Sequence, residues 1–342
     1  MDQSPTPEQE DDEVKRRAAL QIITAAATGT AIPPGVFDTF LSGSRKVLSQ
    51  PVNIDDWARA IREYGYLTPR KPAGSLIRGL TADSLAVGEL IRRENTSSTK
   101  NELLRISAAL SALLAVQLDN TGNRPEGRMS WNLARGMADA SHDQDLRVWI
   151  RSREAEEGLW AGIPPIDIKT LVDEAVTISR GTASAGLARA YMVQAELAAI
   201  RGDKHSASSA LNGMEETFTK LPPADSNSFW VISGEWTYYW TQAYVFTATD
   251  FKKAQKAMDE ASALIPSGNT GSTANLRIIQ SMAMVRAGDI GEGLDEALTT
   301  LHDLPVPRSL FRDHMTSQIL AALPRQARTL PAARELRALT SA

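Results

Sequence analysis

The sequence contains no cysteine, which excludes disulfides, thiolate metal ligands and cysteine nucleophiles. It also lacks a glycine-rich phosphate loop, a G-x-S-x-G nucleophile motif and an H-E-x-x-H metal motif. With no catalytic constellation visible, we predict a protein that is not an enzyme and that uses no cofactor and no metal. The few histidines stand beside aspartates or turn residues, and we interpret them as surface residues: His142, His205, His302 and His314.

A strong net charge and long apolar runs are missing as well. The net charge of −4 over 342 residues gives no global electrostatic reason to bind nucleic acid. No apolar run reaches the roughly 18–20 residues of a membrane span. Lys15-Arg16-Arg17 before an apolar stretch resembles an export signal, but the first 14 residues are acidic and contain no base. We therefore predict a cytoplasmic protein with no membrane contact and no direct nucleic-acid binding.

Alternation with a period of two is absent over any useful length, so the sequence predicts an all-α protein. We divide it into a disordered acidic tail (1–13), an N-terminal helical region (14–100) and a repeat region (101–342). Thr99 and Glu102 form a capping-box pattern before a helix from Leu103 to Leu118 that is apolar almost all round. Such a helix is expected to be buried between neighbours.

A repeat follows from the positions of the turn residues. Gly122, Gly162, Gly202, Thr249 and Gly288 are separated by 40, 40, 47 and 39 residues. A helix-like stretch lies before and after each turn, and prolines often end the second stretch. Recurrence at about 40 residues is typical of stacked helical repeats. We predict a right-handed superhelix of about seven stacked helical hairpins, a tetratricopeptide-like α-solenoid.

The segment from Thr249 to Pro266 has the pattern of the second helix of one hairpin, closed by Pro266. Asp250 is placed to cap the start of this helix by accepting backbone N–H bonds. Ala254 and Ala261 are seven residues apart, so they share one helix face and allow close approach of a neighbouring helix.

Three stretches resemble a known family: LRVWIRSREAEEG at 146–158, the residues from 112 to 146 before it, and AGDIGEGLDEAL at 287–298. Together they are similar to the C-terminal region of actinobacterial Xre-type helix-turn-helix transcriptional regulators. The resemblance implies a tetratricopeptide-like sensor region, ligand sensing and transcriptional control. A DNA-binding head of that family needs about 60 residues, and no room for one exists before Val14. We therefore expect the sensor part without the DNA-binding head.

The candidate site residues lie on the predicted first helices of the hairpins. Arg147 and Arg151 share a face with Glu154, and arginines there are suited to hold a carboxylate or phosphate. The alternative is a solvated face with ion pairs to nearby glutamates.

Residues 229–246 hold eight of the 20 aromatic residues, which favours either core packing or a ligand-facing subset. First helices line the concave side, so we predict one groove holding an acidic ligand with an apolar body. The predicted ligand-binding residues are Arg147, Arg151, Tyr191, Gln194, Trp236, Tyr239, Trp240 and Tyr244.

Three classes of function remain open from the sequence. The leading one is a regulatory sensor or adaptor that binds a peptide, a small signal molecule or a partner protein in the groove. The alternatives are a structural self-associating scaffold, with a possible homodimer, and an enzyme built on a helical-repeat fold. An unpaired set of polar and aromatic groups in the groove favours the first class, and a self-complementary apolar patch favours the second.

Overall fold

The computed structural model describes residues 53–221, 234–303 and 309–341. Within these ranges the protein is all-helical, with fourteen α-helices, one short 3-10 helix and no strand, as the sequence predicts. The predicted acidic tail and the helices expected before residue 53 lie outside the described residues. The α-helices are α3 (Ile54–Leu67), α4 (Ile77–Arg93), α5 (Ser97–Asn120), α6 (Arg124–Ser141), α7 (Gln144–Trp160), α8 (Pro165–Ser179), α9 (Ala185–Ile200), α10 (Lys204–Thr219), α11 (Gly234–Phe246), α12 (Phe251–Ala263), α13 (Thr270–Ala287), α14 (Ile290–Asp303), α15 (Leu310–Ala322) and α16 (Pro331–Ser341).

Consecutive helices pair into hairpins, and the turns fall where the sequence predicts them. Gly122, Gly162, Gly202 and Gly288 all have positive φ, between 71° and 104°, a backbone region that glycine enters without steric cost. Thr249 lies between α11 and α12. The hairpins within the described residues are α5/α6, α7/α8, α9/α10, α11/α12, α13/α14 and α15/α16.

The hairpin built from α11 and α12 has the predicted local structure. Asp250 is the N-cap of α12, and its Oδ1 accepts a bond from the Lys253 N–H at 3.1 Å. Ala254 and Ala261 are fully buried, which confirms the close-packed face.

The predicted capping box at Thr99 is wrong. Thr96 has the extended backbone of an N-cap, so α5 begins at Ser97 and Thr99 already lies inside the helix. The predicted boundary at residue 100 therefore falls within α5, which packs against both α3 and α4.

The helix α5 is long and apolar enough to cross a membrane by length and composition alone. Its most apolar stretch is 72% buried inside the fold, as expected of a core helix. Its apolar face shares a cluster with Ile61 of α3 and Leu80 of α4.

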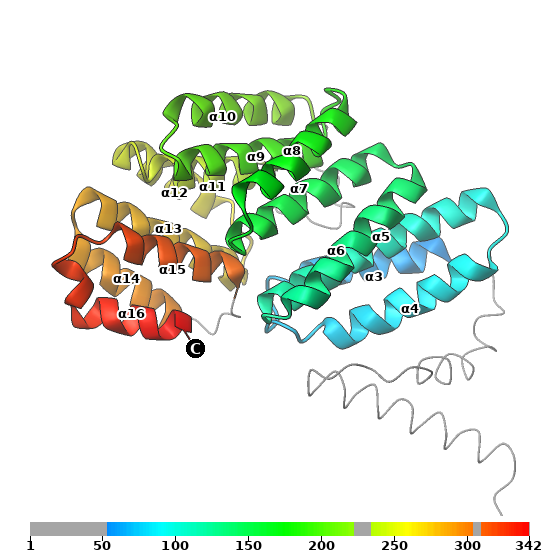
Figure 1. Cartoon of the computed structure of the whole chain (residues 1–342), viewed down its shortest axis with the longest axis horizontal. Coiled ribbons are helices and arrows are strands. Elements are labelled where there is room, and N and C mark those ends of the chain that lie inside the picture. The colour runs from blue at the N-terminus through cyan, green and yellow to red at the C-terminus, as the bar shows by residue number, and fades with distance from the viewer. Residues whose placement is uncertain (1–52, 222–233, 304–308, 342) are drawn as a thin grey trace, which may run out of the picture.

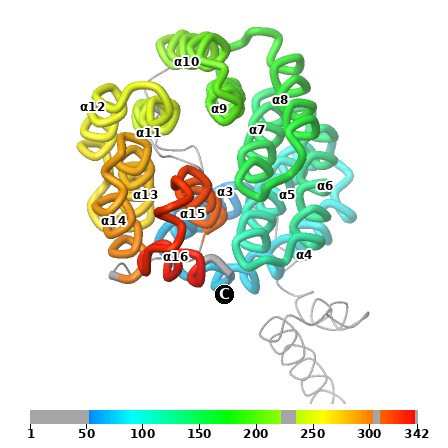
Figure 2. Tube along the Cα trace, turned by 60° about the vertical axis from the view of Figure 1, so that its left-hand side comes forward, coloured from blue at the N-terminus to red at the C-terminus, as the bar shows by residue number. Residues whose placement is uncertain are grey.

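The hairpins are stacked so that first helices lie inside and second helices outside. Figure 2 shows α9, α11 and α13 nearer the centre than their partners α10, α12 and α14. The array curls back on itself, because α15 packs against α7 as well as α13 (Figures 1 and 2). Where the ends meet, the Leu310 N–H donates to Asn120 Oδ1 at 2.9 Å.

Aromatic rings complete this closure between helices that are distant in sequence. The ring of Phe311 on α15 lies 5.2 Å from Trp160 on α7 and 5.1 Å from Trp240 on α11, measured between centroids. Trp160 and Trp240 are 6.4 Å apart in an edge-to-face arrangement. Aromatic pairs at such distances stabilise beyond the area they bury, so this triad ties the ends of the array together.

Candidate ligand-binding cavity

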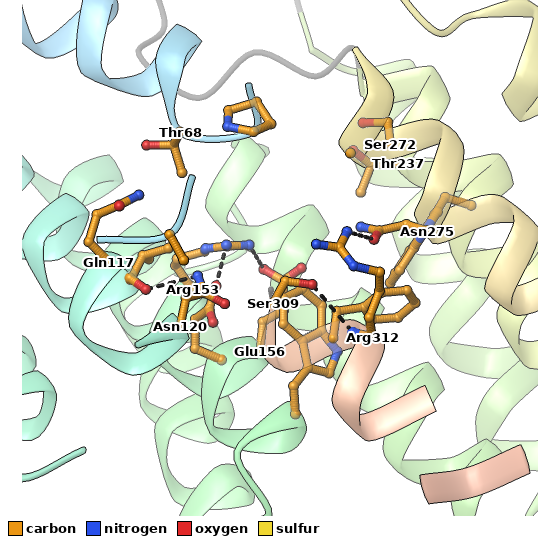
Figure 3. A pocket seen from close by; sticks show the side chains of 18 of the residues that line it. Thr68, Gln117, Asn120, Arg153, Glu156, Thr237, Ser272, Asn275, Ser309 and Arg312 are labelled. Carbon is orange, nitrogen blue, oxygen red and sulfur yellow. Dashed lines mark hydrogen bonds and ion pairs between the residues drawn. The ribbon is translucent and has the colours of Figure 1, made fainter. Parts of the chain in front are cut away.

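A cavity of about 180 Å³ lies at the centre of the array, where the inner helices meet (Figure 3). Its walls come from the inner helices α5, α7, α9, α11, α13 and α15, and from the segment 68–73 between α3 and α4. That segment touches the opposite side of the array, because a Cβ on Gly271 of α13 would lie 2.9 Å from the Pro69 carbonyl oxygen. Residues from both ends of the described chain therefore line one cavity.

Two helices begin at the cavity. Ser272 and Arg312 line it, and each is the third residue of its helix, α13 and α15. The positive end of a helix dipole lies in its first turn, where backbone N–H groups lack intrahelical partners. The starts of these helices therefore add positive potential to this side of the cavity.

On the α7 side of the cavity, the positive and negative charges of an ionic cluster largely cancel. Arg153 pairs with Glu156 and Glu157 on its own helix, and Arg189 of α9 also pairs with Glu156. Burial raises the pKa of Glu157 to about 7, although the Arg153 charge opposes this shift. Two arginines thus face two glutamates, and little net charge remains on this side.

Beneath this cluster lies Glu196 of α9, which is fully buried. Burial raises its pKa well above the ordinary value, and the Glu156 charge raises it further. The Arg189 charge and the nearby Trp160 indole act in the opposite direction, although neither Glu196 oxygen has a hydrogen-bond partner among the described residues. Burial therefore favours the neutral form of the Glu196 carboxyl.

Arg312, on the opposite wall, has no ion-pair partner among the described residues. Its side chain is buried, with 6% exposed, and its Nη1 donates to Asn275 Oδ1 at 3.0 Å (Figure 3). No carboxylate of the described residues lies within ion-pair distance of it. Burial lowers its pKa to about 10, although the nearby Asp313 charge raises it, so the guanidinium stays protonated at neutral pH. The cavity therefore faces an uncompensated positive charge.

Aromatic side chains form the apolar part of the wall: Trp160, Trp236, Trp240 and Phe311. The rings of Trp236 and Trp240 are stacked with centroids 6.0 Å apart. The indole Nε1 of Trp240 is buried and has no hydrogen-bond partner among the described residues. The same holds for Arg153 Nε, Arg189 Nε and Glu157 Oε2. Buried polar atoms in folded proteins nearly always have a hydrogen-bond partner, so several donors here are available to a water or a ligand.

The structure brings two of the predicted ligand-binding residues, Trp236 and Trp240, to the cavity. Tyr244 is buried behind this wall, stacked on Trp240 at 6.3 Å. Tyr239 lies beside Tyr238, with ring centroids 5.6 Å apart, and packs against the core.

The two predicted residues of α9 also lie outside the lining. Tyr191 faces α10, because a Cβ on Gly213 would lie 3.1 Å from its ring. Gln194 is on the same helix and does not line the cavity.

Arg147 and Arg151 do not line the cavity either, which corrects the predicted groove. Arg147 pairs with Asp139 of α6 at 2.7 Å, and Arg151 pairs with Asp139 at 2.9 Å and with Glu174 of α8 at 2.8 Å. They therefore join α7 to its neighbours α6 and α8. Glu154, expected to pair within α7, is bound instead by Arg135 of α6 at 2.8 Å.

Sequence reasoning missed the charged residues that do line the cavity: Arg153, Glu156, Glu157, Arg189 and Arg312. A signal for α7 existed, because Arg153, Glu156 and Trp160 recur at helical spacing on one face. The interpretation of His314 as a surface residue was also wrong. Its Nε2 is buried, and burial lowers its pKa to about 4.

No group of three or more histidines, aspartates and glutamates is placed to hold a metal ion in the part of the chain that the structure describes. The comparisons with known proteins add no family: no family model, curated protein or solved structure matches this chain significantly.

Proposed function

We propose that this protein is a regulatory sensor or adaptor, not an enzyme, that binds a small molecule in the central cavity. One observation carries the proposal. Helices from the whole length of the described chain bring buried polar atoms without partners, and four aromatic rings, to a single cavity. Ligand sites are typically concave and apolar, with a few polar groups placed for orientation.

The polar content of the cavity favours a binding protein over a purely structural scaffold. A helical array that serves only as a support is more stable with an apolar centre, because a half-satisfied buried polar network costs stability. Here buried charges converge on a space that is large enough for a ligand. The volume suits a small signal molecule, or one side chain of a peptide, better than a whole peptide.

The resemblance found in the sequence extends this proposal. We assign the stacked hairpins to a right-handed, tetratricopeptide-like superhelix similar to the sensor region of actinobacterial Xre-type regulators. On that basis the protein acts in transcriptional control in the cytoplasm, and its output passes through a partner protein. The all-helical hairpins support this proposal at the level of the fold.

Native mass spectrometry of the intact protein tests the proposal. We expect a co-purifying small molecule that is lost from Ser272→Phe, because Ser272 is buried on the cavity wall. Thr273→Phe is the matched control, since Thr273 is the next residue of α13 and is exposed. A wild-type protein that carries no small molecule, and binds none from a mixed metabolite library, would contradict the proposal.

A further inference from the structure

We propose that the ligand is a small monocarboxylate bearing an aromatic ring, with Arg312 binding the carboxylate and the indole wall holding the ring. This inference rests on the proposed function and specifies the chemical class of the ligand. Four observations support it: an uncompensated guanidinium, its free edge, the charges across the cavity, and the match of wall and volume to one ring.

The first observation is the charge of Arg312. Arg312 is as buried as a core residue, yet the hydrogen-bond partner of its guanidinium is the neutral amide oxygen of Asn275. Burying an unpaired charge costs several kcal/mol, so a structure that keeps one requires a counterion from elsewhere. Because the guanidinium lines the cavity, an anion in the cavity is the counterion that this geometry accepts.

The second observation is the edge that Arg312 leaves available. Its Nη1 is bonded to Asn275, whereas no described residue accepts a hydrogen bond from its Nε or Nη2. Those two groups form the parallel pair of donors that binds a carboxylate bidentately. The bond to Asn275 fixes the plane of the guanidinium, so the free edge is already oriented (Figure 3).

The third observation limits the charge of the ligand to about one. The α7 side of the cavity presents the carboxylates Glu156 and Glu157, each closely paired with an arginine. A dianion such as a phosphate monoester would be repelled by these glutamates and would exceed the single uncompensated charge opposite them. A monoanion neutralises Arg312 and leaves the α7 cluster unchanged.

The fourth observation is the match of the apolar wall and the volume to a single ring. The rings of Trp160, Trp240 and Phe311 lie within 6.4 Å of one another, in edge-to-face and tilted arrangements that a further ring can extend. A cavity of about 150 Å³ holds benzene in another protein, so about 180 Å³ here is suited to one ring with a carboxylate.

Titration calorimetry of the full chain with benzoate and phenylacetate tests the inference. Benzamide serves as the neutral control, acetate as the control without a ring, and phenyl phosphate as the dianion. We expect benzoate or phenylacetate to bind at least tenfold more tightly than the three controls. Fluorescence gives a second readout, because three of the seven tryptophans line the cavity.

Two variants assign the contact. Arg312→Gln is expected to weaken carboxylate binding about ten- to a hundredfold, the effect of losing hydrogen bonds to a charged group. Arg151→Gln is the matched control, since Arg151 is equally buried but lies outside the cavity, and its binding should stay within twofold of wild type.

The outcomes separate this inference from the proposed function. Equal binding of benzamide and benzoate, tighter binding of phenyl phosphate, or no binding of either carboxylate would overturn the carboxylate assignment. Each of these results leaves the proposed function standing if native mass spectrometry still shows a molecule that Ser272→Phe loses. Unchanged benzoate binding in Arg312→Gln would overturn the role of Arg312.

Discussion

Two buried arginines on inner helices show how differently this fold treats the same side chain. Arg151 and Arg312 are equally inaccessible, with 7% and 6% exposed. Arg151 lies between two carboxylates on neighbouring helices, Asp139 and Glu174, whereas Arg312 is bonded to the amide of Asn275. The first arginine joins adjacent hairpins. The second has no ion-pair partner among the described residues, and we propose that a ligand supplies its counterion.

The surroundings of the two residues reinforce the contrast. Asp139 and Glu174 are half-exposed, so water shares in the solvation of the Arg151 cluster. Arg312 lies at the closure of the array, next to Phe311 and the Trp160–Trp240 pair. Opening this closure would expose Arg312 to water. Ligand binding at Arg312 is therefore expected to stabilise the closed array.

The largest expected effect comes from breaking the closure around Arg312. Phe311→Ala removes a ring, 2% exposed, that contacts α7 and α11, and should lower the free energy of unfolding by about 3–5 kcal/mol. Urea unfolding monitored by circular dichroism measures this change. Leu330→Ala is the control, because Leu330 is 40% exposed and its loss should cost less than about 1 kcal/mol. Equal effects of the two variants would show that the closure contributes little.

A smaller loss is expected when the Arg151 cluster is broken. Arg151→Gln leaves Asp139 and Glu174 without their shared cation, but Asp139 keeps Arg147 and both carboxylates remain partly hydrated. We expect a loss of about 1–2 kcal/mol, below the 3–5 kcal/mol typical of a fully buried pair. The same unfolding experiment applies. An unchanged midpoint would mean that these ion pairs do not hold the hairpins together.

The ionic cluster across the cavity gives a pH-dependent prediction. The pKa of Glu157 is raised to about 7, mainly by burial and also by the charges of Glu156 and Asp119, although Arg153 and Arg189 oppose the shift. Between its unfolded value near 4.5 and about pH 7, the folded state binds more protons, so Glu157 lowers stability as pH rises.

Glu157→Gln removes this titration, so its stability relative to wild type should increase from pH 5 to pH 8. Thermal unfolding of both proteins across this range measures the difference. The variant Glu102→Gln is the control, because Glu102 is half-exposed and lies outside the cavity. A relative stability that stays constant or falls with pH would contradict the assigned shift.

The hairpins could be predicted from the sequence because their turns and helix caps depend on residues that are close together in the chain. A glycine with positive φ ends a helix wherever it stands, so Gly122, Gly162 and Gly202 mark turns without knowledge of the tertiary structure. The helix cap at Asp250 is equally local, since its side chain bonds a backbone N–H three residues ahead.

The cavity depends on packing that no local pattern encodes. Arg151 and Arg153 are two residues apart and point about 200° apart around α7. Arg151 therefore pairs with neighbouring helices whereas Arg153 lines the cavity, and an error in the assumed rotation of the helix assigns the wrong arginine to the cavity. Arg312 reaches the site because α15 returns to α5 and α7, a contact between residues 190 positions apart. Its sequence neighbourhood alone is that of an ordinary surface helix. Trp236 and Trp240 were predicted because aromatic crowding remains visible in the sequence.

Equilibrium unfolding of Arg312→Gln without ligand at pH 7, beside Arg151→Gln, tests the central claim most directly. Glutamine keeps a donor for Asn275 but removes the uncompensated charge, so the account predicts that Arg312→Gln is as stable as wild type or more stable. Arg151→Gln should be less stable by about 1–2 kcal/mol. If Arg312→Gln instead loses as much stability as Arg151→Gln, the charge of Arg312 is neutralised within the protein itself, and the case for an anionic ligand fails.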